Sequence, residues 1–314
     1  MTEVDLTTTV AGLTLASPVL TAAGCGGSGR ELEPFVDLAG LGGFVTRSVT
    51  LDSRPGHPAA RVVETPSGLL HATGLQNPGL QGFLAIELPW LAQRRIPTIV
   101  SICGSDPDEY AELARRIGES PGVTAVEVNL PGTAADEDRP VDPFHAGRLL
   151  ERVRGEVPPG VPVLAKLAAS NLVVDVARAV AKGGADGVVL ADGPGGLALD
   201  PGTLHPVLSA GAGTLSGPAM HALAVRCVWR VHRALPDLPV VGVGGVRTGF
   251  DALELLAAGA RAVQVGSILF ADPSAPQRIR DELAAELRSR SLGAVTDVVG
   301  AAHREPITHG GGPG

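Results

Sequence analysis

Eight short, almost wholly apolar runs follow one another along the chain and constrain its fold more than any other feature. They lack the strict alternation of polar and apolar residues that marks a strand with one wet face. Such runs are typical of strands in a parallel sheet that is buried on both faces. The runs are Pro18–Ala23, Gly43–Thr50, Pro97–Cys103, Ala125–Leu130, Pro162–Ala168, Gly187–Asp192, Pro239–Gly245 and Ala262–Phe270.

Amphipathic helical patterns lie between these runs. Asp106–Pro107 and Asp272–Pro273 have the form of a capping residue followed by proline at a helix start, and Gly259 stops a helix. Eight strand-then-helix units in 314 residues predict a single (β/α)8 TIM barrel. A doubly wound sheet is the alternative, but it usually has fewer strands and no eightfold regularity. Clear helical patterns cover Asp106–Gly118, Leu172–Lys182, Ala219–Ala234 and Phe250–Ala258.

Three segments depart from the alternation. Residues 1–17 are expected to form a short extension that covers the bottom of the barrel. Residues 51–75 are expected to form an extended excursion between the second and third strands. The last residues, 306–314, are rich in glycine and are predicted to be a disordered tail, so that residues 1–305 form one domain.

Charge and cysteine usage exclude several classes of protein. The net charge is −8 and no run of Lys or Arg occurs, which argues against a nucleic-acid partner. Cys25, Cys103 and Cys227 lie far apart in no metal-binding spacing, so we predict reduced thiols and no metal site. No apolar run is long enough to span a membrane, and the first residues do not resemble a signal peptide. We therefore expect a cytoplasmic protein with no membrane partner.

Three glycine-rich segments predict a phosphate site. Gly242-Val243-Gly244-Gly245 ends the seventh strand, Gly266–Ser267 ends the eighth, and Ser216–Gly217 precedes a helix at Pro218. Glycine lets backbone N–H groups approach a phosphate closely, and the loops after strands seven and eight are the usual phosphate cradle of TIM barrels. The alternative is that these glycines only make tight turns. Lys166, at the end of the fifth strand, adds a cation that we expect to face a ligand anion or an electron-rich ring.

Over nearly its whole length the chain resembles the class 1 dihydroorotate dehydrogenases, and class 1B most of all. The resemblance is carried by SPVLTAAGCGGSGRE, GLQNPGL, TAVEVNL, GTLSGPAM, VVGVGGV and VQVGSILFADP. It implies an FMN-dependent oxidoreductase that moves a hydride to the flavin and a proton to a base, turning a ring CH–CH bond into C=C. The family reaction converts dihydroorotate to orotate in pyrimidine biosynthesis. The resemblance also implies a homodimer and an iron–sulfur flavoprotein subunit that passes electrons to NAD; this chain has no four-cysteine cluster motif of its own.

Roles for individual residues follow from the resemblance and from the chemistry of the residues that replace the family's. We expect catalytic roles for His71, Arg47 and Asn129, and substrate contacts from His71, Asn77 and Asp192. The phosphate of FMN would be bound by Gly244, Gly245, Gly266 and Ser267. The rest of the flavin would contact Ala23, Gly24, Arg47, Asn129, Lys166, Ser216 and Gly217.

The substrate half of the family pattern is altered. Class 1B enzymes take their base from a cysteine in NxSCPN, but this chain reads Asn129-Leu130-Pro131-Gly132-Thr133-Ala134, without Cys or Ser. A missing base slows such an oxidation by a factor of about a hundred to ten thousand. Arg47 replaces a lysine, His71 an asparagine, and Asp192-Gly193 an Asn-Ser/Thr pair. The Asp192 carboxylate would repel the carboxylate of orotate in a desolvated pocket.

Several side chains have both a functional and a structural interpretation. His71 suits proton transfer near neutral pH, or it is a loop histidine packed over the barrel mouth. Cys103 ends a strand and faces the flavin or fills the core. We interpret Cys25 as structural, Asp186 as a turn residue, and His145 and His205 as surface residues.

Three functions stay open at the level of sequence. The first is a flavoenzyme of the dihydroorotate dehydrogenase type. The second is a paralogue that acts on another dihydro-heterocycle or an enone in specialised metabolism. The third is a catalytically silent flavin-binding protein that serves as a subunit or sensor.

Overall fold

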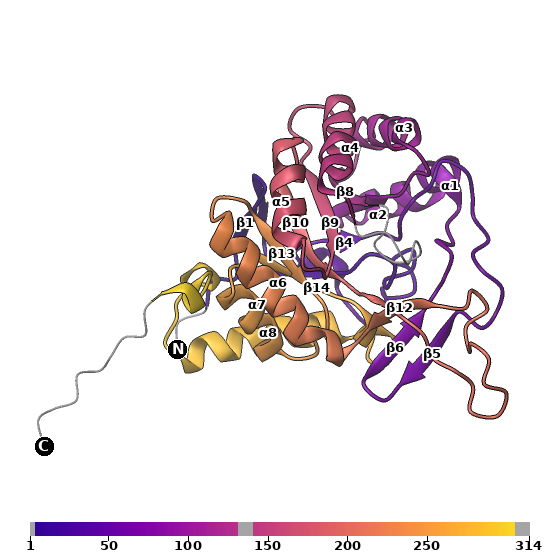
Figure 1. Ribbon diagram of the computed structural model, residues 1–314. Helices are drawn as coiled ribbons and strands as arrows, with labels where there is room; N and C mark the ends of the chain where they lie inside the picture. The colour runs from indigo at the N-terminus through magenta and orange to yellow at the C-terminus, as the bar shows by residue number, and fades with distance from the viewer. Residues whose placement is uncertain (1–3, 131–140, 305–314) are drawn as a thin grey trace, which may run out of the picture.

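A computed structural model describes residues 4–130 and 141–304, and within it eight parallel strands form a barrel (Figure 1). The strands are hydrogen-bonded in the order β3-β14-β13-β10-β9-β8-β7-β4. A parallel bridge between Leu20 and Gly43 joins the two ends of this order. The predicted (β/α)8 fold is therefore confirmed. The barrel strands are β3 (Val19–Thr21), β4 (Phe44–Val45), β7 (Thr98–Ile102), β8 (Val123–Asn129), β9 (Val163–Ala168), β10 (Gly187–Asp192), β13 (Val240–Val243) and β14 (Ala262–Val265).

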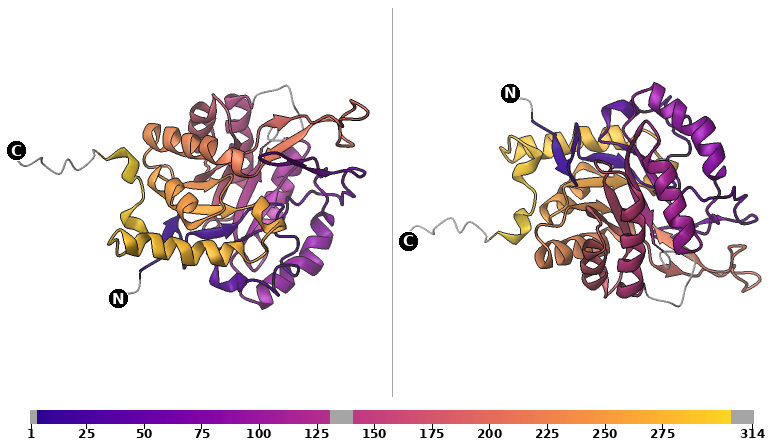
Figure 2. Two further views of the ribbon diagram at one scale, coloured as in Figure 1. Left: turned by 90° about the horizontal axis from the view of Figure 1, so that it is seen from below. Right: turned by 90° about the horizontal axis from the view of Figure 1, so that it is seen from above.

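Helices surround the strands, as Figure 2 shows from two directions. Asp106 caps the first predicted helix through its side chain, which accepts hydrogen bonds from the N–H groups of Asp108 and Glu109. In the described residues no helix has the length and apolar character needed to cross a membrane. The helices are α1 (Gly79–Gly82), the π-helical η2 (Phe83–Glu87), α2 (Leu88–Gln93), α3 (Pro107–Gly118), α4 (Pro143–Glu156), α5 (Val173–Lys182), α6 (His221–Ala234), α7 (Gly249–Ala257) and α8 (Ala275–Ser289). Short 3-10 turns are η1 (Leu38–Gly40), η3 (Pro218–Met220), η4 (Ser267–Phe270), η5 (Val295–Asp297) and η6 (Ala301–His303).

The lower interior of the barrel is apolar and closed by a hairpin. Each barrel strand contributes a buried side chain to one cluster: Leu20, Val45, Ile99, Ala125, Leu164, Val189, Val241 and Ala262. Val10 and Leu15, from the antiparallel strands β1 (Thr8–Val10) and β2 (Leu13–Leu15), pack against this floor. The expectation that the N-terminal extension covers the barrel bottom is confirmed for the described residues 4–17. Residues 1–3 and the predicted tail lie outside the described part of the chain.

A second sheet of four strands lies outside the barrel (Figure 1). Its strands β5 (Val62–Thr65) and β6 (Gly68–His71) belong to the predicted excursion, which is thereby confirmed. Strand β6 of the excursion pairs with β12 (Gly213–Ser216), which in turn pairs with β11 (Gly195–Gly196); both of these strands leave the barrel after β10. The pairing of these two distant segments was not predicted.

Some predicted boundaries were wrong. The apolar run at 262–270 ends as a strand at Val265 and continues as the turn η4, because Gly266 breaks the extended backbone. The run at 43–50 is a strand only at Phe44–Val45. Asp272 does not cap α8 directly; it accepts hydrogen bonds from Ser274, and the helix begins at Ala275.

Candidate active site at the barrel mouth

A layer of polar side chains lies directly above the apolar floor of the barrel. Side chains two residues apart on a strand point to the same face, so Glu127, Lys166 and Gln264 follow Ala125, Leu164 and Ala262 into the interior. Lys166 Nζ lies 3.5 Å from Glu127 Oε1 and donates to Gln264 Oε1 at 3.3 Å. Gln264 Nε2 donates to Glu127 Oε2 at 2.7 Å. The three side chains therefore form a closed triangle inside the barrel.

The triangle determines the charge of Lys166. Burial disfavours the ammonium form, but the nearby carboxylates of Glu127 and Asp192 outweigh it and raise the pKa of Lys166. Glu127 is fully buried, and its Oε1 has no hydrogen-bond partner among the described residues besides the ion pair with Lys166. The sequence predicted that Lys166 faces a ligand; the structure adds a partner in the chain itself. An acidic residue inside an otherwise apolar strand was the signal for that partner.

The predicted phosphate segments come together as a glycine cradle. Gly217, Gly244 and Gly245 all have positive φ angles, at 103°, 123° and 70°, which side chains rarely tolerate. A Cβ atom on Gly245 would lie 2.7 Å from the backbone N of His221 and 2.9 Å from the carbonyl oxygen of Gly217. A Cβ on Gly217 would lie 2.7 Å from the Cα of Gly68. These glycines are therefore required by close approach of the backbones and not only by the turns.

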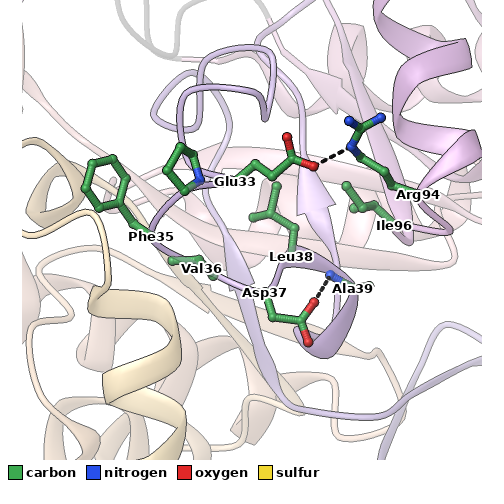
Figure 3. A pocket seen from close by; sticks show the side chains of 9 residues that line it. Glu33, Phe35, Val36, Asp37, Leu38, Ala39, Arg94 and Ile96 are labelled. Carbon is green, nitrogen blue, oxygen red and sulfur yellow. Dashed lines mark hydrogen bonds and ion pairs between the residues drawn. The ribbon is translucent and has the colours of Figure 1, made fainter.

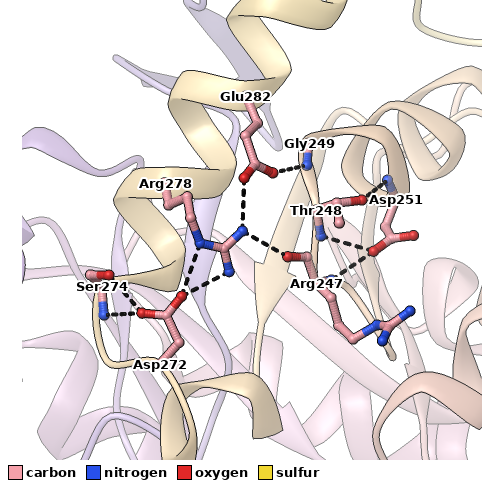
Figure 4. Close-up of polar contacts among 8 residues, drawn as sticks. All are labelled: Arg247, Thr248, Gly249, Asp251, Asp272, Ser274, Arg278 and Glu282. Atoms are coloured by element: carbon pink, nitrogen blue, oxygen red, sulfur yellow. Dashed lines mark hydrogen bonds and ion pairs between the residues drawn. The ribbon is translucent and has the colours of Figure 1, made fainter.

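A network of charged side chains braces the outer side of this cradle (Figure 4). Arg278 of α8 donates to the Asp272 carboxylate after η4 and to the Arg247 carbonyl after β13. It also pairs with Glu282, which accepts the N–H of Gly249 at 2.8 Å. One guanidinium therefore links the loops that follow the seventh and eighth barrel strands.

Asp192 and His71 lie near Lys166 at the top of the barrel. The Asp192 carboxylate influences the pKa values of Lys166, Cys25 and His71, so the four groups share one electrostatic environment. Burial lowers the pKa of His71, and Asp192 opposes that effect. The strand pairing of β10 with β9 is irregular between Leu190 and Asp192, which redirects the end of this strand. Burial raises the pKa of the Cys25 thiol to about 11, against the effect of Lys166. Cys25 therefore stays a thiol near neutral pH.

Arg47 follows β4, and Asn129 ends β8, where it is the register partner of Lys166. The Nε atom of Arg47 is buried and has no hydrogen-bond partner among the described residues. Burial raises the pKa of Glu87, and the charge of Arg47 opposes that effect. The pKa of Glu31 is lowered, because hydrogen bonds with Ser28, assisted by the charge of Arg47, outweigh burial. Asn129 donates to Ser48 Oγ at 3.3 Å, and its carbonyl accepts from the Tyr110 hydroxyl.

Asn77 has a structural position. Its Oδ1 accepts the N–H groups of Thr50 and Gly79, and its Nδ2 donates to Thr50 Oγ1 and to the Leu75 carbonyl. The side chain is buried, and these four hydrogen bonds fix the excursion at the point where α1 begins. The chain itself therefore uses both ends of this amide.

The remaining predicted residues divide between the site and the scaffold. Ala23 and Gly24 follow β3, Ser216 ends β12, and Gly266–Ser267 begins η4. The structural interpretation fits Cys103, which contacts the Tyr110 hydroxyl at 3.6 Å, and Asp186, which accepts the N–H of Val163. His145 and His205 are exposed, as expected. The altered loop at Pro131–Ala134 lies outside the described residues.

A surface pocket lies apart from this site (Figure 3). Its walls come from the segment between β3 and β4, including Phe35 and Leu38, with Arg94 and Ile96 beside them. An ion pair between Glu33 and Arg94 crosses its edge. None of the predicted site residues lines this pocket, so the candidate active site stays at the barrel mouth.

A (β/α)8 barrel with glycines at its seventh and eighth strand ends, and a buried lysine in its interior, has the arrangement typical of barrel enzymes whose ligands carry a phosphate. The sequence profile of the dihydroorotate dehydrogenase family matches residues 5–287. The chain belongs to this family, whose members are FMN-dependent oxidoreductases.

Individual relatives agree over nearly their full length. The chain is 43% identical over 301 residues to the dihydroorotate dehydrogenase B (NAD(+)) catalytic subunit of Pelobacter propionicus, covering 95% of this chain and 98% of that protein. It is 42% identical to the protein of the same name from Desulforudis audaxviator, over 96% and 99% of the two chains. The Anoxybacillus flavithermus protein of that name is 39% identical over 92% and 93%. The predicted resemblance is thus confirmed.

Proposed function

We propose that this chain is an FMN-dependent oxidoreductase that transfers a hydride between the flavin and a small ring substrate, acting on a CH–CH or C=C bond. The observation that carries the proposal is the pairing of the glycine cradle with the Lys166 triangle at one end of the barrel. The cradle suits a phosphate, and the lysine suits an electron-rich ring above it. Family membership supports the same reaction.

The residues present fit FMN. Gly217, Gly244 and Gly245 bring three loop backbones with positive φ angles close together, and Arg47 Nε is a buried donor without a hydrogen-bond partner among the described residues. We assign the phosphate to Gly244, Gly245, Gly266 and Ser267. The rest of the flavin is assigned to Ala23, Gly24, Arg47, Asn129, Lys166, Ser216 and Gly217. When bound, FMN supplies the hydride acceptor; Lys166 supplies a fixed positive charge close to it.

We assign the proton and the substrate to the changed side of the mouth. Burial keeps His71 unprotonated at neutral pH, which is the form that accepts a proton. Arg47 and Asn129 would orient the reacting groups. Asn77 would stabilise the excursion through its hydrogen bonds with Thr50 and Gly79. The Asp192 carboxylate disfavours an anionic ring at the position next to Lys166 and favours one that presents a hydrogen-bond donor. Dihydroorotate is the substrate of the family and carries a carboxylate, so it is the compound with which uncharged and cationic ring compounds are compared in the test.

The missing Cys or Ser between Asn129 and Ala134 supports a second candidate, a flavin-binding protein without dehydrogenase activity. Both candidates share the FMN site and differ only in turnover. A paralogue in specialised metabolism is the intermediate case, active on another dihydro-heterocycle or an enone.

Partners follow from the relatives. Those named catalytic subunits of dihydroorotate dehydrogenase B (NAD(+)) support a second, electron-transferring subunit for this chain, of the iron–sulfur flavoprotein kind. We also propose a homodimer, a cytoplasmic location and one domain over residues 1–305; the predicted tail lies outside the described residues.

The test is anaerobic flavin reduction. We expect the purified protein to be yellow, with released FMN and no FAD. Dihydroorotate at saturation should bleach the flavin slowly or not at all in a stopped-flow cell, whereas photoreduction should bleach it fully. A screen of uncharged and cationic dihydro-heterocycles and enones should then identify a faster partner. A colourless protein that fails to take up FMN would refute the proposal, and no reaction with any ring compound would favour the silent flavoprotein.

A further inference from the structure

One histidine next to the glycine cradle has no role in the proposed function. His221 is the first residue of α6, and its side chain is 15% exposed. Its Nδ1 atom lies 3.3 Å from the carbonyl oxygen of Gly244, in the loop after β13. Its Nε2 atom lies 3.0 Å from Glu254 Oε2 of α7, and 3.9 Å from Asp251 Oδ1. The ring therefore connects the cradle to a second helix.

Both ring nitrogens face acceptors. A carbonyl and a carboxylate each need a donor, so both contacts are hydrogen bonds only when both nitrogens carry a proton. Glu254 and Asp251 are the charged groups that face the ring from α7.

The contact with Gly244 determines the direction of a neighbouring donor. The Gly244 carbonyl and the Gly245 N–H belong to one peptide unit, and a trans peptide points these two groups in opposite directions. Since the carbonyl is turned toward His221, the N–H of Gly245 is turned away from it. Both glycines have positive φ, so the backbone alone does not hold this orientation strongly.

We propose that His221 is a positioning residue that orients the Gly245 N–H for the phosphate of the cofactor. The inference rests on the proposed FMN site and goes beyond it, because His221 would act on the phosphate only and not on the flavin ring. Affinity for the phosphate-bearing flavin should therefore depend on His221, and affinity for the same ring system without phosphate should not.

The experiment compares FMN with riboflavin, which lacks the phosphate. Dissociation constants are measured on flavin-free protein by quenching of flavin fluorescence. We expect His221→Ala to weaken FMN about tenfold or more, as for loss of a hydrogen bond from a charged group, and to leave riboflavin within about twofold. His221→Asn, whose Nδ2 takes about the place of the histidine Nδ1 and can donate to the Gly244 carbonyl, should restore most of the difference. His145→Ala is the matched control, since His145 also contacts a carboxylate near a helix start but is exposed on α4.

Other outcomes overturn the inference. Equal loss of FMN and riboflavin affinity would show a general structural role, and unchanged FMN affinity would show no role. If His221→Ala does not fold, Glu254→Gln tests the same link, and an unchanged ratio of the FMN and riboflavin dissociation constants in that variant would also refute the inference.

A bound metal ion is the alternative explanation of this cluster. The possible metal-ligand atoms of His221, Asp251 and Glu254 lie within 4.8 Å of one another. Loss of FMN selectivity in EDTA, restored by Zn²⁺, would assign the link to a metal and overturn the proposal. Wild-type protein that binds riboflavin but not FMN would refute the inference alone, whereas protein that binds neither would refute the proposed function.

Discussion

Replacing Glu127 by glutamine tests the buried triangle of the barrel. The substitution keeps the shape of the side chain and removes its charge, so Lys166 is left as an unpaired cation in the interior. Lys166 and Glu127 have side-chain exposures of 8% and 0%, so little solvent screens the change. We expect a clear loss of stability in the flavin-free protein.

The magnitude follows from the geometry. Two unit charges 3.5 Å apart, as in this pair, attract each other by about 5 kcal/mol at an effective dielectric constant of about 20. Removing one partner of a buried pair costs about 3–5 kcal/mol, because the other charge stays desolvated. We therefore expect Glu127→Gln to lower the free energy of unfolding by about 4 kcal/mol, a large share of the total of about 5–15 kcal/mol.

The assay is urea unfolding at neutral pH of the wild type, Glu127→Gln, Lys166→Met and the double variant. Each single variant leaves one unpaired charge, but the double variant leaves none. Its loss should therefore be smaller than the sum of the two single losses by at least about 3 kcal/mol. Additivity within about 0.5 kcal/mol would refute the reasoning and show that the two side chains do not interact. The pKa of Lys166 is higher in the folded than in the unfolded protein. Its contribution to the free energy of unfolding should therefore be complete below the pKa of lysine in the unfolded chain, and it should disappear as the pH rises through the pKa of Lys166 in the folded protein.

Three further predictions concern the mouth of the barrel. Lys166→Ala should weaken FMN binding and make the bound flavin harder to reduce, because a cation no longer offsets the charge of the reduced ring; an unchanged midpoint potential in dye-coupled titration would show that Lys166 points elsewhere. With any substrate that turns over, kcat/KM should rise with pH and then level off, and the midpoint of the rise should lie below pH 6.5, because burial lowers the pKa of His71. This rise should vanish in His71→Ala, and its persistence would assign the base to another group. Asp192→Asn should tighten orotate about tenfold in flavin difference spectra, since one like charge is removed, with Asp186→Asn as the control; equal affinities in the wild type and Asp192→Asn would remove the carboxylate from the substrate pocket.

Local sequence predicted the parts of the fold that depend on burial. The eight strands were found because their apolar runs are buried on both faces, and Asp106 marked a helix start through its own side chain. The error at Ser267–Phe270 has the same origin, since an apolar run does not distinguish a strand from a buried turn.

The site was predicted only where glycine spacing shows it. Gly244, Gly245 and Gly217 mark the cradle because their backbone requires glycine. The partners of Lys166 are 39 and 98 residues away along the chain, on strands that become neighbours or face each other only when the barrel closes. No local pattern gives that pairing, although the charge of Glu127 within β8 indicates that a partner exists.

The four-stranded sheet imposes an order on the assembly of the protein. Leu70 of β6 pairs with Leu215 of β12, which is 145 residues later in the chain. During synthesis from the N-terminus, the hairpin β5–β6 therefore exposes an unpaired edge until most of the barrel strands have left the ribosome. Contacts of such long sequence separation form slowly, and an exposed edge is open to pairing with other chains in the meantime. The four-stranded sheet thus cannot be completed before β12 is made, and the nascent chain is most vulnerable to aggregation before the sheet forms.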